Sequence, residues 1–400
     1  MEPQLGWVWL SQQERRAAEQ ALDNLGPDGT RDELGFGVIH FAYADRFFPG
    51  TSVQHTALRY VWFVCWSYLE LQQRYSGGAF PRNELARIED RTGHKLIKYY
   101  GPVDGQGIIG GRVLRVGRSP VTKPSAVYWN AMRSWGLVAP INNATDPPGR
   151  SEIHWRWGEL TSRSPRPEVD PDSARPIFVE PPPQPDRWRV EDRPLSFALD
   201  NKYDEAGRIR RAWARQRDAL GRPTLLSRLA ERRTAAPTSM TNQEVLNLCL
   251  PDEKVSLRRA RQAGALAAIA RALHTAMVQR MKDASESAMA DVRRWLENAV
   301  RDYGADAAKL DLVGLRFDVP EVDKLVKLIE ATQAWLAEGA GDFTRLEPIY
   351  REREMLQKPG RALLARTAGD RRALWRPHDI GPLTYRWDRV AGFLNQLAGK

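Results

Sequence analysis

The stretch over residues 32–71, DELGFGVIHFAYADRFFPGTSVQHTALRYVWFVCWSYLEL, decides the fold class of this chain. Its apolar spacing predicts two helical runs, which a Pro-Gly pair at residues 49–50 separates. The second run is expected to begin at a capping box, in which Thr51 and Gln54 satisfy backbone N–H groups reciprocally. We therefore expect a hinged pair of helices.

The second helix of this pair carries the strongest burial signal in the chain. Residues 61–66 are apolar all round, and a helix without a polar face is a buried helix. The run is much shorter than the ~20 residues that a membrane span needs. We therefore expect the core helix of a soluble domain, with Trp62, Trp66 and Cys65 in the interior.

Hydrophobic periodicity and turn signals predict further helices before residue 140. These are expected over residues 12–24, 82–91 and 124–135. Residues 95–123 place apolar side chains between glycines, which predicts a loop insert or a minor β-hairpin.

Proline divides the chain, because twelve of its 27 prolines lie within residues 140–194. Proline is excluded from helix interiors and favours stiff, extended segments. We expect a proline-rich strap over residues 140–199 that wraps over a domain; a polyproline segment that docks on a partner is the alternative. The strap joins an N-terminal helical domain, residues 1–139, to a C-terminal helical domain, residues 200–400. The predicted fold is thus mainly α.

The charge balance points to acidic ligands without locating a site. The formal net charge is +10 and the pI is about 9.7, a balance that suits a nucleic-acid partner. The excess is spread along the chain, and arginine far outnumbers lysine, as it does in proteins of GC-rich genomes.

Absent motifs argue against several kinds of active site. With only Cys65 and Cys249, neither a disulfide framework nor a cysteine zinc site is expected. The sequence has no GxxxxGK[ST] P-loop, no HExxH zinc motif and no HxK phospholipase-D signature. A literal GxGxxG occupies residues 105–110, but the strand-like alternation of residues 111–117 predicts no helix N-terminus to meet a pyrophosphate. We expect no dinucleotide, no other cofactor and no metal.

Asp45, His55 and Arg59 form the candidate catalytic cluster beside the Pro-Gly hinge. A spacing of four residues puts His55 and Arg59 on one helix face, onto which Asp45 can fold back. The functional interpretation is a histidine oriented by a carboxylate, or an arginine that holds a phosphate. The structural interpretation, which we favour, is a buried Asp–Arg pair that fixes the hinge, because buried charges must be paired.

An arginine-rich helix over residues 206–220 is the candidate nucleic-acid surface. Arg208, Arg211 and Arg215 form one stripe at spacings of three, four and seven residues, and Trp213 lies among them. Arginines with an interleaved aromatic residue are typical of surfaces that follow a phosphate backbone. An ordinary solvated helix face has the same composition, so both interpretations stay open.

Four motifs carry a family resemblance: LGW at residues 5–7, DELG at 32–35, ADRFFPGTS at 44–52 and PSAVYWNAMRSWG at 124–136. In order and spacing they resemble an uncharacterised bacterial family of unknown function, and a looser match continues to YRWDRV at 385–390. Genes of that family often lie near helicase and phospholipase-D-like genes in bacterial defence loci. The resemblance implies this context and no catalytic residue.

Together these features predict a cytoplasmic, non-enzymatic protein of antiviral defence. We expect a nucleic-acid-associated or scaffold subunit that binds DNA or RNA, with helicase or nuclease subunits as partners and no membrane contact. One alternative is an enzyme acting on a phosphodiester or nucleotide at Asp45, His55 and Arg59. The other is a pure protein–protein adaptor.

Overall fold

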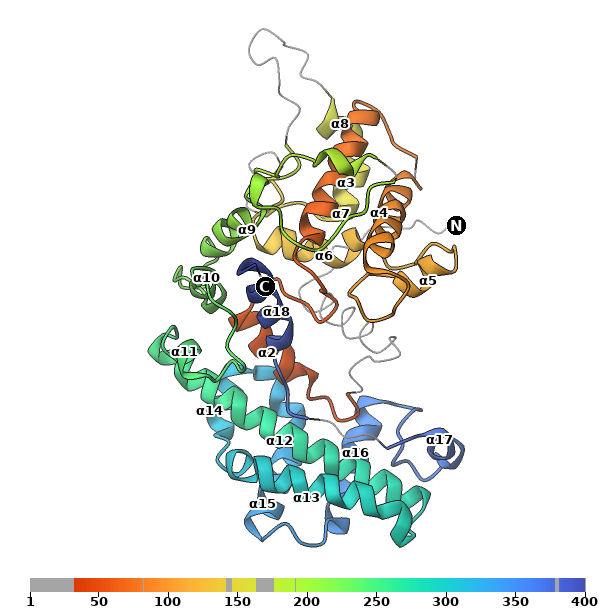
Figure 1. Ribbon diagram of the computed structural model, residues 1–400. Coiled ribbons are helices and arrows are strands. Elements are labelled where there is room, and N and C mark those ends of the chain that lie inside the picture. Colours follow the sequence, from red (N-terminus) through yellow and green to blue (C-terminus); the bar gives the residue numbers. More distant parts are fainter. Residues whose placement is uncertain are drawn as a thin grey trace, which may run out of the picture. The chain divides into compact units, whose positions relative to one another are not determined.

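The computed structural model describes residues 32–81, 83–141, 146–162, 176–190, 192–377 and 381–399. Within these ranges all regular secondary structure is helical (Figure 1). The only extended pairings there are two isolated β-bridges, Val138 with Phe178 and Arg217 with Pro223. The predicted mainly α fold is confirmed. The LGW motif and the helix expected over residues 12–24 lie outside the described residues.

The described α-helices, in chain order, are α2 (Gly37–Phe47), α3 (Tyr60–Arg74), α4 (Glu84–Tyr100), α5 (Gly111–Arg115), α6 (Pro124–Ser134), α7 (Arg150–Trp155), α8 (Trp157–Thr161), α9 (Glu205–Ala214), α10 (Leu225–Ala230), α11 (Gln243–Leu246), α12 (Pro251–Lys282), α13 (Glu286–Ala308), α14 (Leu312–Asp318), α15 (Val326–Ala337), α16 (Glu347–Gln357), α17 (Gly369–Leu374) and α18 (Trp387–Leu397). Short 3₁₀ helices lie at η1 (Asp186–Trp188), η2 (Asn201–Tyr203), η3 (Pro320–Leu325) and η4 (Thr344–Leu346).

The chain forms two compact units, each assembled from two separate stretches of sequence. Unit 1 comprises Met1–Tyr43 and Pro251–Tyr385, and unit 2 comprises Ala44–Leu250 and Arg386–Lys400. This division differs from the expected boundaries at residues 139 and 199. Helices α9 and α10 join the N-terminal helices in unit 2 because their side chains share one core, as when Trp213 contacts Trp135 with ring centroids 5.3 Å apart.

Unit 2 is built around α3. All side chains from Tyr60 to Tyr68 are buried, and Trp62, Cys65 and Trp66 are 0% exposed. Helices α4 and α6 lie against α3. The predicted core helix is therefore confirmed, since a helix that is apolar all round is stable only where neighbours cover every face.

The start of this helix differs from the prediction, because α3 begins at Tyr60 and not at Thr51. The residues between are held by non-helical hydrogen bonds. Thr51 Oγ1 donates to the carbonyl of Phe48 (2.7 Å), and the Tyr128 hydroxyl accepts from the N–H groups of Thr56 and Ala57 (2.8 and 3.0 Å). Partners of this kind offer the backbone an alternative to a helix, so the capping box does not form.

The region of the expected loop or hairpin is also more helical than predicted. Helix α4 continues through Gly93 to Tyr100, and residues 111–115 form the short helix α5 in place of a strand. A Cβ built on Gly93 would lie 2.4 Å from Leu114 Cδ1. Gly93 is thus a packing residue inside α4, where it lets α5 approach closely, and it does not end the helix.

The C-terminal part of the proline-rich segment, residues 176–190 and 192–199, lies on unit 2, and the name strap is kept for these residues from here on. Trp66 Nε1 donates to the carbonyl of Pro182 (2.9 Å), and Trp188 Nε1 donates to the Glu70 carboxylate (2.8 Å). On α4, Lys95 Nζ donates to the carbonyls of Arg187 and Trp188 (2.5 and 2.8 Å). These hydrogen bonds hold the segment against α3 and α4. The segment is therefore part of unit 2 and not a free linker.

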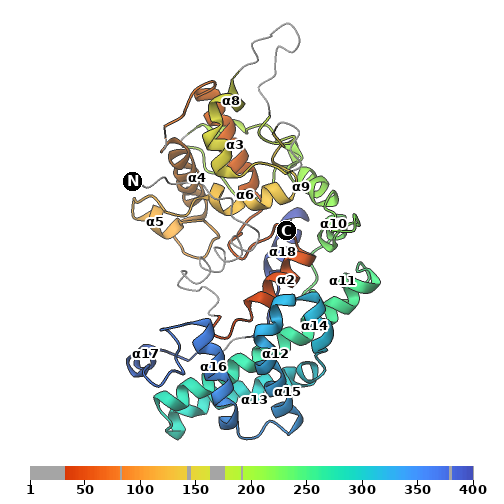
Figure 2. The same ribbon diagram turned by 180° about the vertical axis from the view of Figure 1, so that it is seen from behind.

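Unit 1 is organised by the long helix α12, which lies beside α13 in both views (Figures 1 and 2). The middle of α12 is buried, and most of its buried side chains are small, chiefly alanine. Between α16 and α18 the only α-helix among the described residues is the short α17. The buried Glu354 carboxylate accepts from the N–H groups of Leu363 and Leu364 (2.8 and 2.7 Å), which holds those residues in an irregular conformation.

The DELG motif caps α2 within unit 1. The Asp32 carboxylate accepts from the N–H groups of Gly35, Phe36 and Gly37 at 2.7–2.8 Å. Gly35 has a φ of +87°, and a Cβ there would lie 2.0 Å from Arg353 Nη2. The motif therefore needs glycine both for its backbone conformation and for its contact with Arg353.

Candidate nucleic-acid interface

The arginine-rich segment forms α9 and the turn that follows it, on the surface of unit 2 (Figure 1). The helix ends at Ala214 and not near residue 220 as expected. Ile209, Ala212 and Trp213 form its buried face. The Trp213 ring lies in the core, 5.3 Å from Trp135 and 6.4 Å from Phe393 between centroids, so it is not exposed among the arginines.

Four arginines of this segment bond to backbone carbonyls in place of carboxylates. Arg208 donates to the carbonyls of Tyr203 and Glu180 (3.2 and 2.7 Å), and Arg210 donates to that of Leu397 (2.6 Å). The others lie past the helix end, where Arg215 donates to Arg211 O (3.2 Å) and Arg217 donates to the carbonyls of Ala214 and Gln216 (2.7 and 2.9 Å). No described carboxylate lies within ion-pair distance of any of the four.

A guanidinium that donates to a neutral carbonyl keeps its full positive charge. Residues 204–233 contain nine arginines against four acidic residues. One of the four, Glu205, is buried and already paired with Arg59. Burial, followed by the charge of Arg233, lowers the pKa of Arg210, which indicates that these two cations are neighbours. We call Arg208, Arg210, Arg215 and Arg217 the α9 cluster.

Arg211, the middle arginine of the predicted stripe, pairs with a carboxylate. It pairs with Asp204 at 2.9 Å, and both side chains are about half exposed, at 51% and 57%. An exposed pair of this kind contributes little to stability. Arg211 therefore remains available to a stronger anion at the edge of the cluster.

Asp45, His55 and Arg59 bond to different partners in unit 2. Asp45 accepts from Arg386 Nη1 at 2.6 Å. His55 precedes α3 in an irregular segment, so the expected shared helix face of His55 and Arg59 does not exist. An Asp–Arg pair does occur beside the hinge, but Arg386 is its partner in place of Arg59.

His55 is a core histidine with both ring nitrogens occupied. Nδ1 accepts from the Ser52 N–H (3.1 Å), and Nε2 lies 3.2 Å from the Val127 carbonyl, to which it donates. The ring stacks on Tyr128 at 4.4 Å between centroids. Burial lowers the pKa of His55 to about 3, so the ring is neutral at physiological pH.

Arg59 is also committed to the core. Its Nη2 pairs with Glu205 at 2.8 Å, with side-chain exposures of 1% and 0%, and its Nη1 donates to the Ser196 carbonyl. Burial raises the pKa of Glu205, and the Arg59 charge opposes that rise. A buried pair like this one is strongly destabilised when one partner is removed. The Arg59–Glu205 pair links the start of α3 to the start of α9. It thereby holds in place the helix that carries the α9 cluster.

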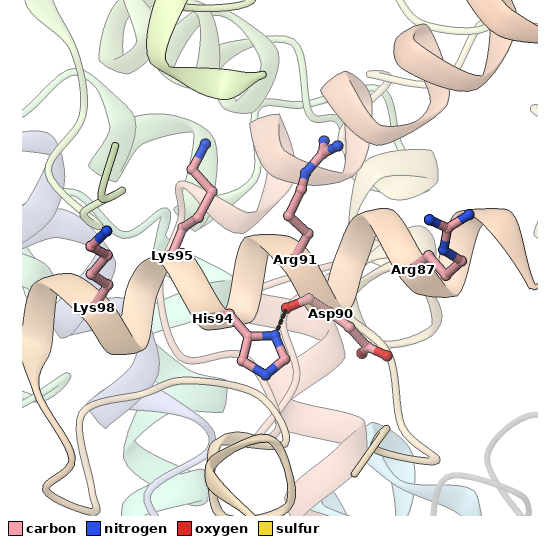
Figure 3. Close-up of a pocket in the computed structure, with 6 residues that line it drawn as sticks. All are labelled: Arg87, Asp90, Arg91, His94, Lys95 and Lys98. Carbon is pink, nitrogen blue, oxygen red and sulfur yellow. Dashed lines mark hydrogen bonds between the residues drawn. The ribbon is translucent and has the colours of Figure 1, made fainter. Parts of the chain in front are cut away.

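A second basic feature, which the sequence interpretation missed, lies on α4. Arg87, Asp90, Arg91, His94, Lys95 and Lys98 line an open depression of about 420 Å³. Figure 3 shows Arg87, Arg91, Lys95 and Lys98 on one side of the helix, with His94 and Asp90 on the other. We call these six residues the α4 stripe. Their spacing of three and four residues was visible in the sequence, but the helix predicted over residues 82–91 ends before His94, Lys95 and Lys98.

The GxGxxG segment lacks the preceding strand of a dinucleotide site, but the expectation that no helix follows it was wrong, because α5 begins directly after Gly110. Helix α4, and not a strand, precedes it, and α5 after it has only five residues. Gly107 lies against Thr56, whose hydroxyl donates to its carbonyl (2.6 Å). Gly110 has a φ of +69°, and Pro120 lies on it. The glycines thus serve turns that pack closely.

The described residues give no sign of a metal centre or a membrane span. No group of three or more His, Cys, Asp or Glu side chains within the described ranges is arranged to hold a metal ion. No helix in the same part of the chain is both long and apolar enough to cross a bilayer.

Comparison with known proteins gives a match to a family model. Residues 3–145 match the model of DUF6361, a family of unknown function. No curated protein and no solved structure matches the chain. The matched part contains α2–α6, including the core helix and the α4 stripe, but it ends before α9.

Proposed function

We propose that this protein is a non-enzymatic nucleic-acid-binding subunit, and that the α9 cluster holds the phosphate backbone. The observation that carries this proposal is the bonding of Arg208, Arg210, Arg215 and Arg217 to carbonyl oxygens. Other surface arginines of unit 2, such as Arg156 and Arg222, pair with a carboxylate. The α9 cluster therefore adds positive charge to α9 and the turn after it that no described carboxylate balances by an ion pair.

The carbonyl contacts also favour binding by holding the side chains in place. A guanidinium fixed by one or two hydrogen bonds loses less conformational entropy when a phosphate meets its remaining N–H groups. Each phosphate that it neutralises releases condensed counterions. Contacts to phosphate position a protein without reading bases, so we expect binding that is independent of sequence and sensitive to salt.

The proposal extends to the biological setting. The resemblance to a family whose genes often neighbour helicase and phospholipase-D-like genes supports a role as a subunit of a multi-gene bacterial defence system. In that system the partner proteins would supply the motor and nuclease activities. The test is purification of the tagged chain with its genomic neighbours, with and without nuclease treatment. Partners that leave after nuclease treatment are held through nucleic acid, and partners that stay are held through protein contacts.

The decisive experiment removes charge from the exposed arginines of the segment. The α9 variant carries Arg211→Gln, Arg215→Gln and Arg217→Gln, which keep side-chain length and helix propensity. Arg208 and Arg210 stay, because their bonds to the strap and to α18 contribute to folding. The matched control, Arg293→Gln, Arg294→Gln and Arg301→Gln, removes the same charge from exposed positions of α13.

The measurement is affinity for a mixed-sequence DNA duplex across a salt series. We expect the α9 variant to bind more weakly and its log K versus log salt slope to fall by about one unit per lost contact. The control variant should resemble the wild type. An α9 variant with unchanged affinity and slope, and an intact circular dichroism spectrum, would falsify the proposal and favour a protein–protein adaptor.

A further inference from the structure

Arg271, a buried residue of α12 in unit 1, carries a positive charge without a bonded partner. The side chain is 8% exposed, and it makes no hydrogen bond and no ion pair with any described residue. Burial lowers the pKa of Arg271, and the charge of Asp32 opposes this effect without cancelling it. Buried charges are normally paired, because their desolvation is otherwise uncompensated. Arg271 therefore lacks the acceptor that its burial calls for.

The same part of unit 1 holds a second buried guanidinium, that of Arg353 on α16. His274, one turn after Arg271, lies 3.1 Å from the carboxylate of Glu354, the residue that follows Arg353. Arg353 is also 8% exposed and donates only to neutral oxygens, through Nε to the Leu34 carbonyl (2.6 Å) and through Nη2 to a glutamine side chain (3.1 Å). Its Nη1 has no hydrogen-bond partner among the described residues.

The two carboxylates of this region are occupied by other donors. Asp32 accepts from three backbone N–H groups at the start of α2. Glu354 accepts from two N–H groups of the segment after α16 and lies against His274. The charge of Asp32 acts on both Arg271 and Arg353, and burial nevertheless lowers the pKa of each guanidinium. One carboxylate that already caps a helix thus serves two buried cations, so a further anion would be stabilised here.

The placement of the two arginines indicates the kind of anion. Arg271 and Arg353 come from different helices, so a group that accepts from both must offer oxygen atoms in more than one direction. The two oxygens of a carboxylate lie in one plane and match a single guanidinium fork, whereas a tetrahedral phosphate has oxygens for two. Because both side chains are only 8% exposed, the group must also be small.

We propose that Arg271 and Arg353 form a site for one phosphate group, beside the Asp32 cap of α2 in unit 1. Arg271 supplies its whole guanidinium fork, and Arg353 supplies Nη1 while its other nitrogens keep their present partners. The phosphate is either inorganic phosphate or the terminal phosphate of a nucleotide. The inference does not depend on the proposed function, because the α9 cluster belongs to unit 2.

The test compares three variants of the full chain. Arg271→Met removes the charge and keeps most of the side-chain volume, and Arg271→Lys keeps the charge but loses the fork. The matched control is Arg258→Met, the same exchange at an exposed position of α12. Calorimetry at constant ionic strength measures the binding of inorganic phosphate, adenosine monophosphate and acetate. Urea unfolding measures stability with and without phosphate.

We expect the wild type and Arg258→Met to bind phosphate, Arg271→Met to bind it about tenfold more weakly or worse, and Arg271→Lys to lie between them. Phosphate should raise the urea midpoint of the wild type, because it binds only the folded state, and this rise should be lost in Arg271→Met. Without phosphate, Arg271→Met should be at least as stable as the wild type, since no hydrogen bond is lost. Binding of adenosine monophosphate as well as phosphate assigns the site to a nucleotide, and binding of phosphate alone assigns it to the inorganic ion.

No phosphate binding by the wild type, or equal binding by Arg271→Met and Arg258→Met, overturns the inference. Acetate that binds as tightly as phosphate also overturns it, because the ligand is then a carboxylate. If Arg271→Met does not fold, an unchanged phosphate affinity in Arg271→Lys overturns the inference on its own. Duplex binding by the α9 variant is a separate measurement, so either proposal can fail while the other stands.

Discussion

Trp62 and Trp66 are equally buried in α3 but differ in hydrogen bonding. Both are 0% exposed. Trp66 Nε1 donates to the Pro182 carbonyl of the strap, whereas Trp62 Nε1 has no acceptor among the described residues. We expect either tryptophan-to-alanine substitution to lower the free energy of unfolding by ~3–5 kcal/mol, since it leaves a large cavity.

The phenylalanine substitutions separate packing from hydrogen bonding. Trp66→Phe removes a donor from a buried carbonyl, so it should cost roughly 1 kcal/mol more than Trp62→Phe. Equilibrium urea unfolding measures the difference, and Trp155→Phe, at a position that is 86% exposed, is the control. Equal losses in Trp62→Phe and Trp66→Phe would show that the bond to the strap contributes nothing to stability.

At the scale of elements, Gly93 shows how one missing side chain fixes a helix contact. A Cβ at this position would lie 2.4 Å from Leu114 Cδ1, and Leu114 is buried. Gly93→Val should therefore destabilise the protein by ~1–3 kcal/mol, the usual cost of overpacking. Leu114→Ala makes room, so the double variant should lose less than the sum of the single variants. Additive losses in a urea double-mutant cycle would mean that Gly93 matters for another reason.

The sequence correctly predicted those helices whose burial shows in a short run of neighbouring residues. The apolar run of residues 61–66 sufficed for α3, and the apolar spacing of Ile209, Ala212 and Trp213 was itself a sign that Trp213 faces the core. The start of α3 was not predictable in this way. It depends on Tyr128, which is more than 70 residues away and bonds to Thr56 and Ala57.

For the candidate sites, the sequence predicted where charged residues gather but not which partners they bond to. Arginine density located the α9 cluster, because composition is a local property. The choice between a neutral carbonyl and a carboxylate as partner depends on distant residues, such as Leu397 for Arg210 and Glu205 for Arg59. Asp45, His55 and Arg59 likewise bond to partners that the spacing of the three did not reveal.

At the scale of the whole molecule, the exposed aromatic side chains and the α9 cluster occupy different parts of the chain. The large exposed aromatic residues in the described ranges are Tyr99, Trp155 and Phe317, and none lies in residues 204–233. Tyr203, just before α9, has the Lys202 ammonium over its ring at 5.0 Å. The cluster thus offers phosphate contacts but no free aromatic face on which an unpaired base could stack.

This separation predicts a preference for double-stranded nucleic acid. Single-strand binders gain ~1–3 kcal/mol per base from aromatic stacking, which this surface lacks. A duplex presents one charge per ~1.7 Å, about twice the density of either of its strands. We therefore expect the full chain to bind a DNA duplex at least severalfold more tightly than a single strand of equal length at the same salt concentration. Fluorescence anisotropy measures both affinities.

Trp213→Phe should leave both affinities unchanged, because the indole is buried. Tighter binding of the single strand, or a selective loss of it in Trp213→Phe with the fold intact, would mean that bases reach an aromatic surface and that phosphate contacts alone do not explain recognition.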